Sequence, residues 1–303
     1  MSMRFAVVGT GFWARQTHAK ALAAHPDVEL VGVWGRAFAR AAEMADAVGA
    51  RPYEHADDMF ADVDAVAFAV PPDVQAELAV RAAGRGCHLL MDKPVAFTSE
   101  GADRVVDAVD RAGVRSLVFF TSRFVENQAR WLTDVQQQPA WNSGYVRMYA
   151  SIFEPGNPFG ESEWRRLRGA LWDIGPHALS ILLPALGPVT HVVADRGHGD
   201  MVALVLHHES GATSIMSLSL TAPPGSCGDA WQLFGEHCQM SMPTATSTPV
   251  EAMGACISEL ITDQPGRWSH PCDVRFGRDV VSVLEAADRF LQRPLDSRGQ
   301  PVA

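Results

Sequence analysis

The stretch of sequence that decides the fold is residues 4–14, which read RFAVVGTGFWA. Residues 4–9 are a short apolar run that ends in glycine, which predicts a buried strand. Residues 13–25 are rich in alanine and contain no helix breaker, which predicts a helix. A glycine-rich turn therefore joins a strand directly to the start of a helix, where backbone N–H groups are available to bind phosphate.

The spacing within this turn, G-x-G-x-x-A, is typical of a dinucleotide site. Gly9 would make the tight turn, Gly11 would let the backbone approach a pyrophosphate, and Ala14 would keep the helix close to the strand. The alternative is a glycine turn with a purely structural role. The residues of this turn that we expect at the cofactor are Gly9, Thr10, Gly11, Phe12, Trp13 and Ala14.

Beyond the turn, apolar strands and helices alternate up to about residue 121. The predicted strands are 4–9, 28–34, 64–70, 88–91 and 116–121, and the predicted helices are 13–25, 36–48, 73–83 and 99–112. Apolar strands that alternate with helices form a parallel sheet covered on both faces. We therefore expect residues 1–121 to be an NAD(P)-binding Rossmann domain, an α/β fold with a doubly wound parallel sheet.

The second half of the chain has a different pattern, with runs of strands and segregated helices. The predicted helices are 125–138, 173–185 and 275–292, the predicted strands are 144–153, 189–194, 201–208 and 213–221 with short ones in 231–242, and 238–250 is expected to be a loop. Residues 201–208 and 213–221 form a predicted hairpin. This pattern indicates an α+β domain over 122–303 with a mainly antiparallel sheet.

One predicted strand suggests how that sheet is used. Met216, Leu218 and Leu220 alternate with the hydroxyl residues Ser217, Ser219 and Thr221. Exposure to solvent is one interpretation of the hydroxyl face. A subunit interface is the other, because the face lacks the charges that usually keep sheet surfaces apart. We expect a homo-oligomer, a dimer or tetramer, formed through this sheet.

Composition excludes several classes of protein. The chain has 303 residues, 47% of them hydrophobic, and a net charge of 25 − 35 = −10. Disorder needs lower hydrophobicity, and nucleic-acid or anionic-membrane binding needs clustered basic residues. The five cysteines form no C-x-x-C pair, which fits a reducing compartment without a disulfide framework or zinc site. We expect a cytoplasmic protein with a small-molecule substrate and no partner among nucleic acids or membranes.

Histidines are also not arranged as metal ligands. His207 and His208 are adjacent on a predicted strand, so their side chains would point to opposite faces. His191 and His198 have no partner at ligand spacing in the sequence. We therefore expect no metal site.

The end of the second predicted strand bears on the choice of dinucleotide. NAD sites usually carry an acidic residue there for the ribose 2′-hydroxyl, whereas this chain has Trp34, Gly35 and Arg36. Gly35 would leave room, and Arg36, helped by Arg40 one turn later, would pair with a 2′-phosphate. NADP is therefore favoured. The alternative is a solvated Arg36 and NAD held by backbone contacts.

Two further places in the sequence carry groups suited to proton transfer. Asp92-Lys93-Pro94 follows the fourth predicted strand, so Lys93 would face the crevice where ligands bind, and the bond before Pro94 can be cis. The chain has 23 arginines and only two lysines, Lys20 and Lys93. Lys93 would donate to a substrate oxygen, although a lysine before proline is often a simple surface residue.

Asp173 and His177 begin the helix of the second domain, in the sequence Asp173-Ile174-Gly175-Pro176-His177. Spacing of i, i+4 places the carboxylate and imidazole on one helical face. An imidazole suits proton transfer to a carbinol or carbonyl oxygen. The alternative is that Asp173 caps the helix and His177 is only packed.

Together these motifs resemble the Gfo/Idh/MocA oxidoreductases, the glucose–fructose oxidoreductase and inositol dehydrogenase family. The glycine turn matches. The turn containing Val70 and Pro71 resembles the family's strand-four turn, Asp92-Lys93-Pro94 resembles its E-K-P motif, Arg123-Phe124 its R-F pair, and residues 173–177 its D-x-G-x-H signature. The match covers the layout of the whole chain and is strongest up to about residue 186. It implies a Rossmann domain followed by an α+β domain over 122–303 that binds the substrate and whose open sheet often makes oligomer contacts.

The resemblance also implies roles. His177 would donate or accept the proton, Lys93 would hydrogen-bond the reacting oxygen, and Asp173 would orient substrate or His177. The cofactor would contact Val70, Pro71, Asp92, Lys93, Pro94 and Arg123 besides the glycine turn, Gly35, Arg36 and Arg40.

The chain departs from the family at several positions. Gln75 stands where the family often has histidine, Arg168-Gly169-Ala170 stands where it often has three glycines, and Ser180 stands where it often has Asp or Asn. These departures leave fewer sugar-binding groups and put a standard polyol substrate in doubt.

The expected function is hydride transfer between a nicotinamide and a hydroxyl- or carbonyl-bearing carbon of a sugar, polyol or related molecule. Two alternatives use the same fold: a non-catalytic NADP-binding regulator, and a redox-neutral glycosidase that uses NAD. A regulator has no need of Lys93, Asp173 and His177, and a glycosidase would retain its cofactor through purification.

Overall fold

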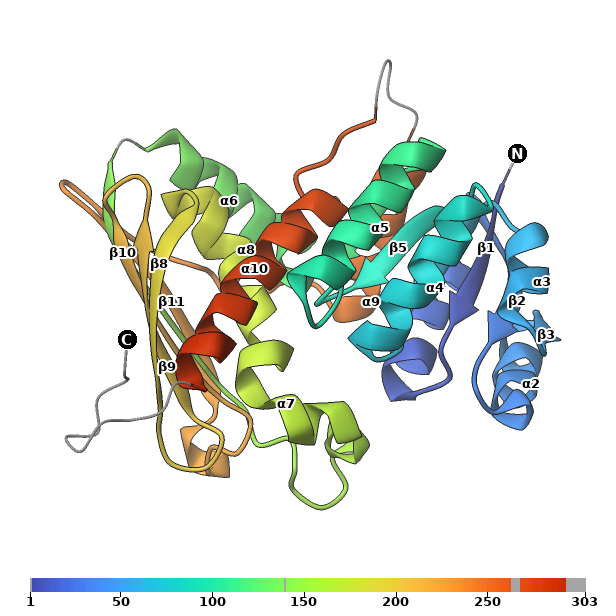
Figure 1. Cartoon of the computed structure of the whole chain (residues 1–303), viewed down its shortest axis with the longest axis horizontal. Helices are drawn as coiled ribbons and strands as arrows, with labels where there is room; N and C mark the ends of the chain where they lie inside the picture. Colours follow the sequence, from blue (N-terminus) through green and yellow to red (C-terminus); the bar gives the residue numbers. More distant parts are fainter. Residues whose placement is uncertain (1, 139, 263–267, 293–303) are drawn as a thin grey trace. The chain divides into compact units, whose positions relative to one another are not determined.

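The computed structural model describes residues 2–138, 140–262 and 268–292. These residues form two compact units (Figure 1). The first holds the residues up to Glu126 together with the described part of 245–281, and the second holds Asn127–Thr244 together with the described residues from Ser282 on. The chain therefore enters the second unit at Asn127, returns to the first at Ala245 and leaves it again at Ser282.

The first unit is built on a six-stranded sheet in the order β3-β2-β1-β4-β5-β6, with every pair of neighbours parallel. This order reverses between β1 and β4, as in a doubly wound dinucleotide-binding sheet. The expected Rossmann fold is confirmed. The strands are β1 (Met3–Val8), β2 (Val28–Trp34), β3 (Arg51–Tyr53), β4 (Ala65–Phe68), β5 (His88–Asp92) and β6 (Ser116–Phe119).

The helices of the first unit follow the predicted alternation, with additions. They are a π-helical segment Ala14–Ala19 continued by α1 (Lys20–Ala24), then α2 (Phe38–Val48), α3 (Ala56–Ala61), α4 (Pro72–Gly84), α5 (Ser99–Ala112), a 3₁₀ turn Thr121–Arg123, α9 (Pro249–Ile261) and the start of α10 (Val274–Leu291). The π-helical winding and the short elements β3 and α3 were not predicted. Three and six residues are too few for a periodic pattern to show.

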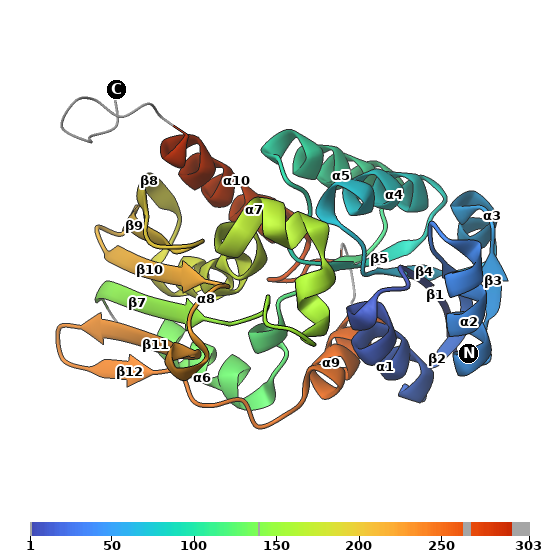
Figure 2. The same ribbon diagram turned by 90° about the horizontal axis from the view of Figure 1, so that it is seen from below.

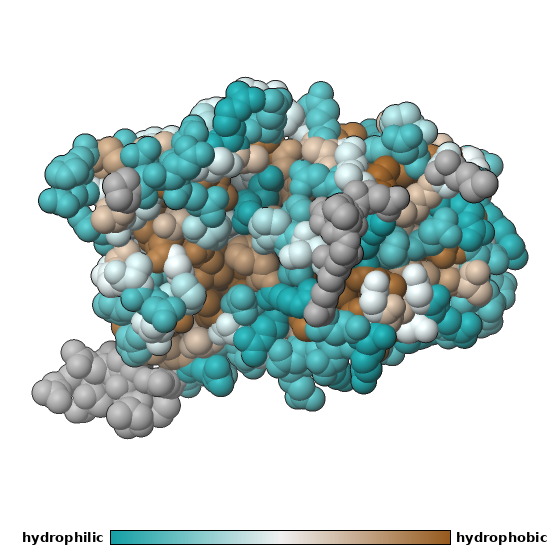
Figure 3. Space-filling view, turned by 90° about the horizontal axis from the view of Figure 1, so that it is seen from above, coloured by the Kyte–Doolittle hydropathy of each residue, from teal (hydrophilic) through white to brown (hydrophobic). Residues whose placement is uncertain are grey.

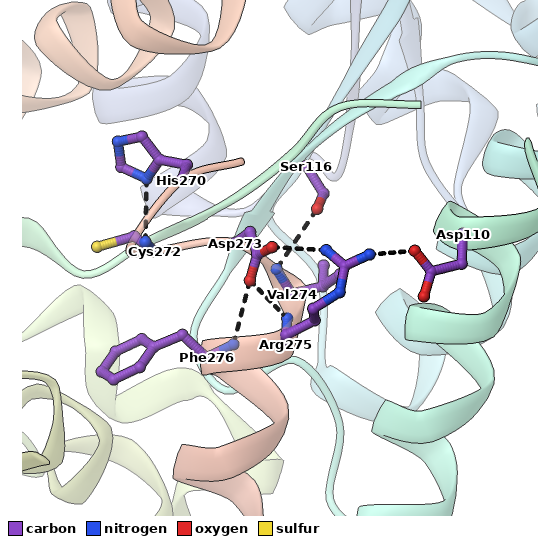
Figure 4. A network of polar contacts seen from close by, with 8 residues as sticks. All are labelled: Asp110, Ser116, His270, Cys272, Asp273, Val274, Arg275 and Phe276. Atoms are coloured by element: carbon purple, nitrogen blue, oxygen red, sulfur yellow. Dashed lines mark hydrogen bonds and ion pairs between the residues drawn. The ribbon is translucent and has the colours of Figure 1, made fainter. Parts of the chain in front are cut away.

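Residues 245–281 were expected in the second domain, but their described part packs in the first unit. One reason is α9, whose apolar side chains, among them Met253 and Ile257, are buried. The start of α10 is tied to α5 by Arg275, which pairs with Asp273 and with Asp110 (Figure 4). These long-range contacts, and not the order of elements, decide where the segment belongs.

The second unit is built on a sheet in the order β12-β11-β7-β10-β9-β8 (Figure 2). Only β7 and β10 pair in parallel, so the expected mainly antiparallel sheet is confirmed, as is the β9–β10 hairpin. The elements are α6 (Glu126–Gln137, which starts at the end of the first unit), β7 (Trp141–Tyr149), α7 (Glu163–Asp173), α8 (Gly175–Leu186), β8 (Val189–Arg196), β9 (Val202–His208), β10 (Thr213–Ser219), β11 (Gly228–Gly235) and β12 (Gln239–Ser241).

The two faces of this sheet differ. Met216 and Leu218 of β10 are fully buried on the face that packs against α7 and α8. On the other face the predicted hydroxyl residues are present, but they contact other side chains, and the face is not free of charge. Ser217 contacts the Tyr149 hydroxyl at 2.8 Å and lies opposite Arg147, which gives the face a charge.

The remaining two hydroxyls of that row are used within the chain. The Ser219 hydroxyl donates to Asp200 at 2.9 Å, and the Thr221 hydroxyl donates to the same carboxylate at 2.8 Å. The described residues still leave two apolar side chains of the open face exposed, Val193 at 37% and Ile215 at 45%.

The surface shown in Figure 3 mixes hydrophilic residues with smaller hydrophobic areas. Among the described helices, none is both long and apolar enough to cross a membrane. All five cysteines are free thiols.

Candidate active site

The glycine turn after β1 has the geometry that the sequence predicts. Gly9 has φ +125°, and a Cβ there would lie 2.3 Å from the carbonyl oxygen of Ala69 after β4. Its N–H donates to the Trp34 carbonyl at 2.8 Å. Both the positive φ and the contact with neighbouring backbone exclude any side chain. Gly9 therefore lets the chain turn sharply between the ends of β2 and β4.

Gly11 has a different surrounding. A Cβ at this position would meet no atom of the described chain within 4 Å. The space beside Gly11 is therefore open, and it would allow a pyrophosphate to approach the backbone closely. Ala14 is fully buried, as expected for close packing of helix on strand, and Phe12 is 39% exposed beside the turn. These residues fit a dinucleotide.

At the end of β2, one expectation needs correction. A Cβ on Gly35 would lie 2.6 Å from the Thr10 methyl group, so the room at Gly35 is taken by Thr10 and is not free for a ligand. Arg36 and Arg40 are exposed, and neither makes an ion pair within the described ranges. No acidic residue ends β2.

Beside Arg36 lies a cavity of about 520 Å³ that the sequence did not predict. Trp34, Val74 and Leu78 supply apolar walls, and Trp34 is held by its indole N–H, which donates to the Glu54 carbonyl at 3.2 Å. Four acidic residues also line it: Glu54, Asp57, Asp58 and Glu77. Asp57 is neutralised by Arg81, whose guanidinium lies 2.7 Å away.

Lys93 lies at the carboxyl end of β5, two strands from β1 in the sheet order, and its side chain is half-buried. The Lys93–Pro94 peptide bond is cis. The turn is held by Gln75 of α4, a buried residue whose amide nitrogen donates to the carbonyls of Asp92 at 2.8 Å and Pro94 at 3.0 Å. The amide oxygen of Gln75 accepts the Asp92 N–H at 2.9 Å. Gln75 thus supports the backbone that carries Lys93.

Asp92 also faces a residue that the sequence analysis missed. His18 of the π-helical segment is fully buried, and its Nε2 lies 3.6 Å from Asp92 Oδ2. Burial raises the pKa of the Asp92 carboxyl, but His18 and Lys93 outweigh this effect, so the pKa is lowered overall. Without the observed winding of residues 14–19, no sequence pattern singles out His18.

The other expected cofactor residues lie in the same unit. Val70 and Pro71 follow β4, and Pro71 precedes α4 with φ −54°. Arg123 ends the 3₁₀ turn after β6, with its guanidinium 5.6 Å from the centre of the Phe276 ring. Thus the expected cofactor residues follow β1, β2, β4, β5 and β6, all at the carboxyl ends of parallel strands, where ligands bind in such sheets.

Asp173 and His177 belong to the second unit. Asp173 is the last residue of α7, and Ile174 separates it from α8, so it is not the cap of the predicted helix. The buried Asp173 carboxylate pairs with Arg165 Nε at 3.1 Å instead. His177, in the first turn of α8, is half-buried, and its carbonyl accepts the Ser180 hydroxyl at 2.7 Å.

The partner of Asp173 was not predicted. Arg165 lies over two aromatic rings, with its guanidinium carbon 4.8 Å from the centre of Trp164 and 5.5 Å from that of Phe159. Such cation–π contacts fix the direction of a long side chain. The residue lies eight positions before Asp173 in a helix interrupted at Gly169, where φ is +64°, so helical spacing alone does not reveal the pair.

Histidines and acids do not gather into a metal site in the part of the chain that the structure describes. His208 is buried and contacts the Gly187 carbonyl at 2.7 Å and the Ser214 hydroxyl at 2.8 Å, whereas His207 is exposed on the opposite face. His191, expected to have no partner, lies beside His207 on the neighbouring strand, with 5.8 Å between ring centres.

Comparison with known proteins identifies the family. The family model described as "Oxidoreductase family, NAD-binding Rossmann fold" matches residues 3–120, and the "GFO/IDH/MocA C-terminal domain" matches residues 142–241. The dTDP-3,4-didehydro-2,6-dideoxy-alpha-D-glucose 3-reductase of Streptomyces antibioticus is 32% identical over 97% of this chain and 93% of its own. The Rhizobium meliloti rhizopine catabolism protein MocA is 25% identical over 97% and 96%.

Solved structures agree on the fold. The WlbA dehydrogenase from Bordetella pertussis, in complex with NADH and UDP-GlcNAcA, has a TM-score of 0.80 at 23% identity, with 98% of this chain and 100% of that chain covered. A relative that is 32% identical along almost the whole chain, together with two family models in the expected order, establishes more than a shared fold. The chain belongs to the GFO/IDH/MocA family of NAD(P)-binding oxidoreductases.

Proposed function

We propose that this protein is an NADP-dependent oxidoreductase that transfers a hydride between the nicotinamide and a hydroxyl- or carbonyl-bearing carbon of a sugar or related polyol. The observation that carries the proposal is a row of residues that follow the carboxyl ends of neighbouring strands in the Rossmann sheet. Gly9 and Gly11 follow β1, Val70 follows β4, and Lys93 follows β5. The residues that would bind the dinucleotide and the lysine that would act as the ammonium donor therefore all follow the carboxyl ends of strands in one sheet.

The residues that would hold the dinucleotide are those of the glycine turn, with the pyrophosphate at Gly11 and the N-terminal end of the following helix. When bound, the cofactor supplies or accepts the hydride. The protein supplies position and protons. Lys93 would donate a hydrogen bond to the reacting oxygen, and His177 would carry the proton to or from it. Asp173, held by Arg165, would orient the substrate or His177.

The preference for NADP is supported by the end of β2. The 2′-hydroxyl of NAD is normally bound by an acidic residue at this point, and none is present. Arg36 has an exposed guanidinium with no ion pair in the described ranges, so it is available for a phosphate. The acidic residues that line the neighbouring cavity repel the negative charge of a 2′-phosphate. The preference for NADP over NAD therefore depends on the attraction that Arg36 contributes.

Titration with NADPH and NADH tests this preference, with binding measured by nucleotide fluorescence. We expect tighter binding of NADPH, and loss of that difference in Arg36→Ala. The matched control is Arg40→Ala, in the first turn of α2, which should have the smaller effect. Tighter binding of NADH by the wild-type protein would refute the role of Arg36.

For the substrate, one relative that matches almost the whole chain is named as a reductase of a dTDP-linked keto sugar. A screen should therefore begin with nucleotide-linked and free keto sugars, with NADPH consumption as the readout. Lys93→Ala and His177→Ala should each lower turnover severely while NADPH still binds. Turnover that remains intact in both variants would show that the roles are wrongly assigned.

We also propose that a second copy of the chain covers the open face of the second unit's sheet. The described residues place helices on one face only (Figure 1), and Val193 and Ile215 are exposed on the other. Large exposed apolar residues on an otherwise uncovered sheet favour association.

A further inference from the structure

A buried histidine faces the strand end that carries Lys93. His18 is fully buried, and neither of its ring nitrogens has a hydrogen-bond partner among the described residues. Its Nε2 lies 3.6 Å from Asp92 Oδ2, an ion-pair distance that is too long for a hydrogen bond. Buried polar groups are normally paired. An imidazole that is left with only this carboxylate therefore needs a reason to be there.

The backbone around His18 is also unusual. Residues Ala14–Ala19, directly after the glycine turn, are wound as a π-helix. Such winding is rare and concentrates at functional sites. It gives each turn an extra residue and so changes the direction of the side chains that follow. His18 is directed at the last two strands of the sheet order, where it lies by Asp92 of β5 and edge-on to Phe119 of β6, with 6.4 Å between ring centres.

Asp92 links this histidine to Lys93. One carboxylate oxygen, Oδ2, faces His18, and the other, Oδ1, accepts the backbone N–H of Lys93 at 2.8 Å. Gln75 meanwhile holds the N–H and the carbonyl of Asp92 itself. The backbone of Asp92 and both oxygens of its side chain thus have defined neighbours. The orientation of the carboxylate in turn sets the peptide from which the Lys93 side chain departs.

We propose that His18 is a positioning residue, which acts through the carboxylate of Asp92 to set the direction of Lys93. The inference rests on the proposed role of Lys93 at the reacting oxygen. His18 itself would touch neither substrate nor cofactor. Because a displacement of about 1 Å at a reacting group can lower the rate about 100-fold, a residue that fixes direction affects turnover more than binding.

Kinetics of two variants test the proposal. His18→Phe keeps a buried ring next to Phe119 and removes both ring nitrogens, whereas His18→Gln keeps a donor that can face Asp92. We expect kcat to fall about 10- to 100-fold in His18→Phe, with partial recovery in His18→Gln and unchanged affinity for NADPH. The control is His25→Phe, which removes a histidine shortly after α1 that contacts Ser258 instead, and should keep wild-type kcat.

A double-mutant cycle with Asp92→Asn separates positioning from a general structural role. If His18 acts through Asp92, the double variant His18→Phe/Asp92→Asn should lose no more kcat than the more damaged single variant. Independent effects would instead multiply, because their free energies add. A multiplicative loss would overturn the proposal.

A third readout does not depend on turnover. The chain has only two lysines, so reductive methylation with ¹³C-formaldehyde yields side-chain NMR signals from Lys20 and Lys93 alone, apart from the N-terminus. We expect the Lys93 signal to move in His18→Phe and in Asp92→Asn. Lys20, at the start of α1, reports any general disturbance of the helix and should not move.

The outcomes distinguish this proposal from the proposed function. If the wild-type protein transfers no hydride to any substrate, the proposed function fails, and the Lys93 signal alone decides whether His18 positions it. If His18→Phe does not fold, His18→Gln and Asp92→Asn decide by the same signal. A folded His18→Phe protein with an unchanged Lys93 signal, or with wild-type kcat, would overturn the proposal.

Discussion

Replacing Gln75 by methionine should damage both stability and turnover. The substitution keeps the length of the side chain and removes its amide. Gln75 donates to the carbonyls of Asp92 and Pro94, with a longer contact of 3.3 Å to that of Val95, and accepts the Asp92 N–H. Each hydrogen bond contributes about 1 kcal/mol, and a buried group left unpaired costs about 1–3 kcal/mol. With one N–H and at least one carbonyl orphaned, Gln75→Met should destabilise the first unit by about 2–4 kcal/mol.

Urea unfolding, followed by circular dichroism, measures this loss. The control is Arg81→Gln on the same helix, which breaks an ion pair with Asp57 whose side chains are 41% and 44% exposed and should cost less than about 1 kcal/mol. Because the amide also holds the backbone on both sides of Lys93, at Asp92 and Pro94, kcat should fall in Gln75→Met beyond what unfolding explains. Stability within about 0.5 kcal/mol of wild type, with wild-type kcat, would refute the role given to Gln75.

Three further predictions concern other parts of the chain. Burial raises the pKa of Cys87 and of Cys272 to about 11. A disulfide reagent at pH 8 should therefore label the exposed thiols of the native protein, and should react with these two only after denaturation. Rapid labelling of either thiol in the native protein would contradict this prediction. Burial lowers the pKa of His208, so below about pH 6.5 the unfolded state binds more protons than the folded state, and the free energy of unfolding should fall as the pH drops. The pH dependence of Tm should be flatter in His208→Asn. An unchanged slope in that variant would contradict the role given to His208. Ile215→Glu should reduce the mass measured by light scattering to that of a monomer without loss of fold, and a monomeric wild-type protein would end the proposal of a covered sheet face.

The Rossmann half could be predicted because its signals are local. Apolar strands, alanine-rich helices and glycines at turns follow each other within a few residues, and Gly9 has the positive φ and close backbone contact that its place in the motif requires. The position of Lys93 follows from the same logic, since a residue that directly follows a parallel strand lies at the carboxyl end of that strand, where ligands bind in such sheets. The hairpin in the second half was also predicted from local turn residues.

What could not be predicted depends on contacts between distant residues. The membership of α9 in the first unit is decided by apolar burial against elements more than 100 positions away. Gly35 was expected to leave room for a ligand, but Thr10 fills that room. The pairs Arg165–Asp173 and His18–Asp92 need, respectively, an interrupted helix and a π-helical segment, and neither irregularity has a clear signature in the sequence.

Transfer of deuterium from [4-²H]NADPH to a keto sugar tests the central claim most directly. Incubation of the wild-type protein with nucleotide-linked and free keto sugars, followed by mass spectrometry, should reveal a product that gains one deuterium and one exchangeable proton. The transfer should be lost in His177→Ala while NADPH still binds. A wild-type protein that binds NADPH and transfers no deuterium to any of these sugars, or a His177→Ala protein that transfers it at the wild-type rate, would contradict the account.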